Sequence, residues 1–141
     1  MQPIALAEDE RRTLAALAAH ALEPTGERLT LAARHGGGSE AGSAVCVREV
    51  IAEAEVIARV FEAAHDGVID VGDPDIRAWL ALRRDALLSL LRDDRAALYD
   101  SLATRHTAGE DVAVAQRWRL VDEDLEELAL VARLLSDALG R

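Results

Sequence analysis

The chain has 141 residues, with 16 basic and 26 acidic side chains and a formal net charge of −10. This length predicts a single domain over 1–141, and half of the residues are apolar, so a core can form without metals or disulfides. The acidic balance disfavours nucleic acids and anionic membranes as partners, because both present negative charge. The single cysteine, Cys46, excludes an internal disulfide and favours a cytoplasmic location.

Alanine and leucine together fill 49 positions, whereas the aromatic residues number only four. Because alanine, leucine, arginine and glutamate form helices well, we expect an all-α fold, namely a bundle of four to five helices. No uncharged apolar run is long enough to cross a membrane, and the N-terminus lacks the basic and apolar regions of a signal peptide. We therefore expect neither a membrane segment nor a leader.

The N-terminal segment, 1–35, is predicted to be helical in two pieces. The first helix is expected from about Ala5 to Leu22 and is stopped by Pro24, which cannot donate a backbone hydrogen bond. A short second helix is expected from Thr25 to Arg34. The run from Gly36 to Gly38 then predicts a flexible glycine-rich joint over 36–41.

Three long helices are predicted in the rest of the chain, 42–141. The first covers about Gly42 to His65 and is followed by Gly67, which suits a left-handed cap. The short segment between Gly67 and Gly72 can be extended, but it is too short to make a sheet alone. The single cysteine lies near the start of this first helix.

The second long helix is expected to begin at Asp73, which is a good N-cap, with Pro74 and Asp75 in its first turn. It is expected to reach about Arg105. Its apolar residues form two neighbouring rows, one with Leu80, Leu87, Leu91, Leu98 and Leu102, the other with Trp79, Leu82, Ala86, Leu90 and Ala97. A polar run from Arg92 to Arg95 lies in its middle and could mark a kink.

The last helix is expected over about Gly109 to Leu139, after a capping box of Thr107 and Glu110. Together with the preceding helix it predicts a long C-terminal antiparallel helical hairpin. Eight apolar residues follow one another in steps of three and four: Val114, Trp118, Val121, Leu125, Leu128, Ala132, Leu135 and Leu139. Such a seam closes inside a bundle or pairs with a second chain.

This excess of apolar surface favours a non-catalytic protein–protein interaction or oligomerisation module, such as an adaptor, a regulator or an accessory subunit. The expected partner is a second copy in a homodimer, or another protein. The interface residues would be Trp118, Val121, Leu125 and Leu128, at the centre of the seam. No cofactor is implied.

An enzymatic alternative rests on Arg59 and His65, which are separated by five residues, and on Arg28 and His35, which are separated by six. Both spacings match the Arg-x(4–6)-His signature, and in this motif, its size and its helicity the chain resembles the HEPN-type helical ribonucleases. The resemblance implies that the arginine and histidine bind and polarise the phosphate and 2′-hydroxyl at a scissile RNA bond. The structural alternative is a helical ion pair of Arg59 with Glu55 and a histidine near the helix end.

A second alternative is a metal-binding or small-ligand-binding bundle. Glu62 and His65 have the Glu-x-x-His spacing that places a carboxylate and an imidazole on one helix face, and Glu55 lies one heptad before Glu62. Helical di-iron proteins use this spacing on two helices. Here it occurs once, so the competing interpretation is a helix-terminal histidine beside solvated glutamates.

Overall fold

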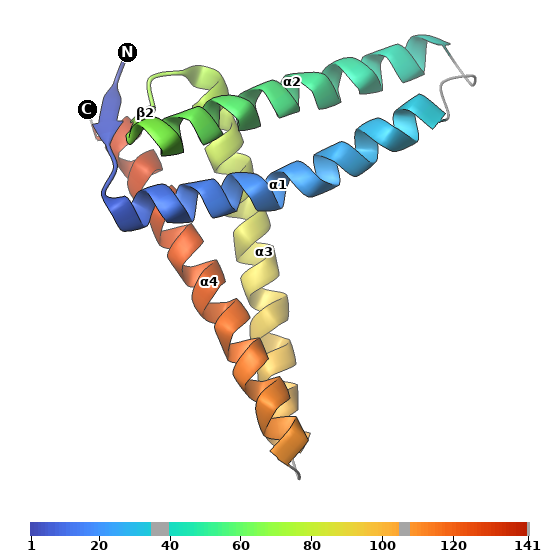
Figure 1. The fold of residues 1–141 in the computed structure, drawn as a ribbon, viewed down its shortest axis with the longest axis vertical. Helices are drawn as coiled ribbons and strands as arrows, with labels where there is room; N and C mark the ends of the chain where they lie inside the picture. Colours follow the sequence, from blue (N-terminus) through green and yellow to red (C-terminus); the bar gives the residue numbers. More distant parts are fainter. Residues whose placement is uncertain (35–39, 105–107, 141) are drawn as a thin grey trace. The chain divides into compact units, whose positions relative to one another are not determined.

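The computed structural model describes residues 1–34, 40–104 and 108–140. This part of the chain is built from four helices, α1 (Glu8–Arg34), α2 (Glu40–Asp66), α3 (Pro74–Thr104) and α4 (Ala108–Leu139), and two short strands, β1 (Pro3–Ala5) and β2 (Val68–Asp70) (Figure 1). It divides into two compact units, Met1–Trp79 and Leu80–Arg141. The predicted all-α fold is confirmed.

In the first unit α1 packs against α2, and this packing explains why α1 is one helix rather than two. The predicted stop at Pro24 is wrong, because the proline lies inside a continuous helix of 27 residues. A proline inside a helix removes one backbone donor and crowds the carbonyl group four residues before it, at a cost of about 3 kcal/mol, which the packing of the helix has to offset. The buried side of α1 continues past it, from Leu17 and Ala21 to Thr25, whose hydroxyl donates to the carbonyl oxygen of Ala21 at 3.0 Å.

The strands β1 and β2 form a two-stranded antiparallel sheet that joins the start of α1 to the end of α2. Ile4 pairs with Ile69, and Ile69 is fully buried. The first helix therefore begins at Glu8 rather than near Ala5, because the residues before it are taken up by strand pairing. The extended segment after Gly67 is too short to form a sheet alone, and it pairs with the N-terminal strand β1.

The C-terminus of α2 ends as predicted, with a left-handed glycine. Gly67 has a φ of 79°, and its N–H donates to the carbonyl oxygen of Ala63 at 2.8 Å. The guanidinium group of Arg11, on α1, donates to the carbonyl oxygens of Ala64 and His65, with 3.0 Å between Nε and the Ala64 oxygen. A cation from the neighbouring helix thus satisfies the last carbonyls of α2 and complements its dipole.

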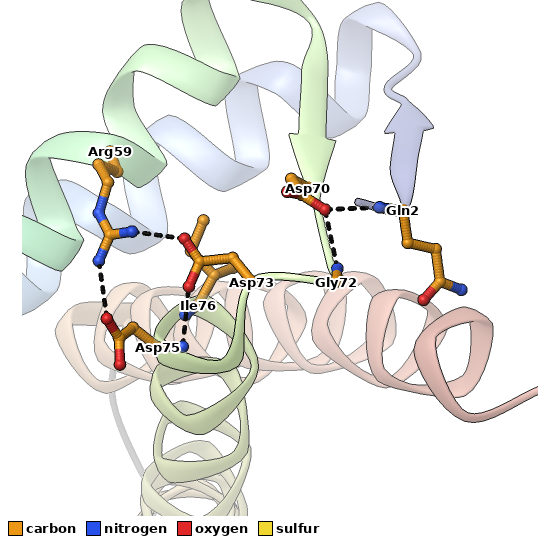
Figure 2. A network of polar contacts seen from close by, with 7 residues as sticks. All are labelled: Gln2, Arg59, Asp70, Gly72, Asp73, Asp75 and Ile76. Atoms are coloured by element: carbon orange, nitrogen blue, oxygen red, sulfur yellow. Dashed lines mark hydrogen bonds and ion pairs between the residues drawn. The ribbon is translucent and has the colours of Figure 1, made fainter.

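Two aspartates organise the turn between β2 and α3 (Figure 2). Asp70 Oδ1 accepts hydrogen bonds from the backbone N–H of Gln2 at 2.8 Å and of Gly72 at 2.9 Å. The bond from Gln2 is the main reason why the pKa of Asp70 lies below its ordinary value. Asp73 Oδ1 accepts from the N–H groups of Asp75 at 2.9 Å and Ile76 at 3.4 Å, so the predicted N-cap of α3 is confirmed.

From Asp73 onward, α3 runs without interruption to Thr104, so the polar run from Arg92 to Arg95 does not break it. The helix α4 ends at Leu139, and the N–H of Gly140 closes its last turn by donating to the carbonyl oxygen of Ser136 at 2.9 Å. The predicted joint over 36–41 is wrong at its end, because α2 already begins at Glu40; residues 36–39 and the capping residue Thr107 lie outside the described residues. The antiparallel packing of α3 on α4 along their length stays a prediction.

Candidate interaction surface

The helix α4 has one buried side and one exposed side, and the predicted seam lies on the exposed one. The residues with 0 to 7% exposure are Asp124, Glu127, Leu130, Val131 and Leu134. None of the eight seam residues from Val114 to Leu139 belongs to the buried class. Four of these residues are exposed and four are half-buried, so the stripe that the sequence predicts as a packing seam is not buried within the second unit.

The four predicted interface residues all lie on this exposed side. Trp118 is 56% exposed and Leu125 is 48% exposed, while Val121 and Leu128 are half-buried. Trp118 and Leu125 are seven residues apart, or two helical turns, so they share one side of the helix. We call this set, Trp118, Val121, Leu125 and Leu128, the α4 apolar face.

Charged residues follow one flank of the α4 apolar face. Arg119, Asp122 and Glu126 succeed one another in steps of three and four, which places them along one line of the helix. All three are exposed. The basic side chain lies beside Trp118 and the acidic side chains lie near Leu125, so the charge changes sign along the flank.

The two predicted rows of α3 each contain buried and exposed residues, since Trp79 of the second row is buried and Leu102 of the first row is exposed. Leu80, Leu87 and Leu98 of the first row are buried, whereas Leu82 and Leu90 of the second row are exposed by 69% and 46%. The exposed large apolar side chains of the described residues are concentrated in the second unit: Leu82, Leu88, Leu90, Tyr99, Leu102, Val112, Trp118, Leu120, Leu125 and Leu139. Two helices alone leave this surface in contact with water.

Sequence reasoning missed a buried acidic group of α4, Asp124. Asp124 is 5% exposed, and its Oδ2 atom is buried without a hydrogen-bond partner. Burial, together with the neighbouring negative charges of Asp94, Glu127 and Glu123, raises the pKa of Asp124 to about 7. The available signal was the position of Asp94, which lies on the buried row between Leu87 and Leu98.

The ribonuclease hypothesis placed Arg59 and His65 together, and the structure does not bring their side chains into one site. The guanidinium group of Arg59 forms ion pairs with Asp73 and with Asp75, the latter at 3.3 Å (Figure 2). The structural alternative also named the wrong partner, since Glu55 does not hold this arginine. His65 is exposed at the end of α2. The side chains of Arg28 and Cys46, and His35 altogether, lie outside the described part of the chain.

A surface depression of about 560 Å³ lies beside His65 in the first unit. It is lined by Arg11, Arg12, Phe61 and His65 among others, and Arg59 does not line it. Arg11 already donates to two backbone carbonyls there, and Glu8 adds a negative charge to the rim. The depression therefore contains His65 but not Arg59, the arginine with which the motif pairs it.

The metal hypothesis gains no support from the geometry. Glu55, Glu62 and His65 are all exposed. Within the described ranges, no group of three or more His, Cys, Asp or Glu side chains is arranged to hold a metal ion.

Comparisons with protein-family models, with curated proteins and with solved structures gave no match for this chain. Among the helices of residues 1–34, 40–104 and 108–140, none combines the length and the apolar character that a membrane span requires. The arguments for function therefore come from the chain's own residues, of which the α4 apolar face is the most distinctive.

Proposed function

We propose that this protein is a non-catalytic helical assembly module of the cytoplasm, which associates with a second copy of itself through the α4 apolar face. In that role it would serve as an adaptor, a regulator or an accessory subunit. The observation that carries the proposal is the exposure of Trp118 and Leu125 on a seam whose periodicity is that of a helix–helix interface.

Burial of this face supplies the driving force for association. Covering a large apolar side chain is worth about 1.5–3 kcal/mol, and tryptophan is enriched among the residues that dominate interface energies. In a two-fold symmetric dimer each residue of the face is buried twice, once in each copy. Trp118 and Leu125 of the two copies would thus contribute four buried side chains.

Charge complementarity favours a second copy as the occupant, with the two α4 helices antiparallel. A two-fold axis near Asp122 places Trp118 of one copy against Leu125 of the other. The same operation brings Arg119 beside the acidic side chains at Asp122 and Glu126 of the second copy, because a flank faces the equivalent flank. Parallel pairing would instead set this flank against the opposite flank of the second copy, so Arg119 would not meet Asp122 and Glu126.

Sedimentation velocity of the full chain over a hundredfold range of concentration tests the proposal. We expect a concentration-dependent dimer for the natural sequence, and a shift toward monomer for Trp118→Ala and for Leu125→Ala. The matched control is Leu22→Ala, which removes an exposed leucine of α1 (43% exposed) and should leave the dimer unchanged. A monomer at every concentration would overturn the proposal, as would equal shifts for Trp118→Ala and the control.

A further inference from the structure

The depression of the first unit carries charged and apolar side chains that the assembly proposal does not use. It lies where the start of α1 meets the end of α2 (Figure 1), and its volume is about 560 Å³. Small-molecule sites in proteins have volumes of roughly 300–1,000 Å³. The depression shares no residue with the α4 apolar face, so its role is independent of the assembly proposal.

Two pairs of side chains, one pair from each helix, line this depression. Glu8 and Arg12 are four residues apart on α1. Phe61 and His65 have the same spacing on α2. Because residues at this spacing lie on one side of a helix, each helix presents two neighbouring side chains to the same space. The pair on α1 consists of two opposite charges, one helical turn apart.

The two charges on α1 are available to a ligand. Glu8 and Arg12 are both exposed, and within the described residues neither side chain has a hydrogen bond or an ion pair. Arg11 differs, because its guanidinium group donates to the carbonyl oxygens of Ala64 and His65 and is held in the wall of the depression. Arg12 is therefore the cation, and Glu8 the anion, that remain for binding.

The rest of the lining is apolar and consists of Leu6, Ala15, Phe61 and Ala64. The ring of Phe61 is half-buried, so one part of it is open to contact with a ligand. A ligand with a single charge would meet a like charge, since Glu8 and Arg12 are one turn apart. A zwitterion with an apolar side chain would instead find a partner for each of its three groups.

We propose that this depression binds a free α-amino acid with an apolar side chain. Glu8 accepts hydrogen bonds from the ammonium group, and Arg12 donates to the carboxylate in the planar geometry that suits a guanidinium group. The ring of Phe61 covers the apolar side chain of the ligand. The net charge of the chain, −10, does not repel this ligand, because a zwitterion has no net charge.

A series of three ligands, added to the full natural chain at neutral pH, tests the proposal through the NMR shifts of the backbone amides. L-Phenylalanine should give saturable shifts at the residues of α1 and α2 around the depression. 3-Phenylpropanoate lacks the ammonium group and 2-phenylethylamine lacks the carboxylate, so each should bind about tenfold more weakly. The absence of a saturable shift with phenylalanine would overturn the proposal, and so would equal affinity for either analogue.

Two substitutions test the assigned partners. Glu8→Gln and Arg12→Met each remove one charge from an exposed side chain, so they should fold and should weaken phenylalanine binding by about tenfold. Glu8→Gln should not weaken the binding of 3-phenylpropanoate, which has no ammonium group. The controls Glu23→Gln and Arg48→Met make the same changes at exposed positions outside the depression and should bind like the natural chain. Unchanged phenylalanine binding in either test variant would overturn the proposal.

Discussion

Arg11 of α1 donates a hydrogen bond from Nε to the carbonyl oxygen of Ala64 in α2, at a distance of 3.0 Å. The two residues are 53 positions apart in the chain, and the contact fixes the start of one helix against the end of the other. The same guanidinium group reaches the carbonyl oxygen of His65. Arg11 therefore caps the C-terminal end of α2 together with Gly67, although no pattern in the sequence singled this arginine out.

Replacement of Arg11 by methionine should destabilise the chain by about 1–2 kcal/mol, because charge-assisted hydrogen bonds to the last carbonyls of α2 are lost while most of the apolar stem is kept. Arg12→Met is the matched control, since Arg12 is an exposed neighbour on the same helix. Urea unfolding midpoints measure the difference, and equal midpoints for the two variants would contradict the capping role.

Alanine in place of Gly67 should destabilise the chain by about 1–2 kcal/mol, because a side chain disfavours a φ of 79°. The space around the new Cβ is adequate, since its nearest neighbour would be Cδ of Arg11 at 3.4 Å, so the cost lies in the backbone. Gly26→Ala provides the contrast. That glycine lies within α1 with open space around it, so alanine should stabilise the helix by about 0.5–1 kcal/mol.

Removal of the Asp73 carboxylate by alanine should cost about 1–2 kcal/mol, because the N-cap of α3 and the ion pair with Arg59 are lost together. Asp75→Ala loses only an exposed ion pair with the same arginine, so its cost should be below about 1 kcal/mol. Thermal unfolding of the two variants side by side gives the ranking, and a larger effect of Asp75→Ala would show that the cap contributes little.

Charge reversal tests the antiparallel register of the proposed dimer. Arg119→Glu and Glu126→Arg should each raise the dissociation constant by roughly threefold to tenfold, because each single change creates two like-charge contacts in the symmetric dimer. The double variant restores opposite charges at the two symmetry-related contacts between positions 119 and 126, and should recover part of the affinity, because Asp122 stays unchanged. Arg77→Glu, an exposed change on α3, controls for net charge. Additive losses in the double variant would exclude this register.

Local signals in the sequence determined the start of α3 and the end of α2. Asp73 and Pro74 predict the start of α3, and Gly67 predicts the end of α2, because helix caps and left-handed turns depend on a few adjacent residues. Helical periodicity likewise identified the seam through Trp118 and Leu125. These features depend on the chain within one or two turns, which a sequence displays directly.

Contacts between distant residues were decided only by the tertiary structure. Pro24 is tolerated because the packing of α1 on α2 outweighs one missing hydrogen bond, and Ile4 becomes a strand residue because Ile69 is available to pair with it. The side of α4 that is buried is the one carrying Asp124 rather than Trp118. Periodicity shows that one face of a helix is apolar. Whether that face is buried depends on the other elements that the fold packs against it.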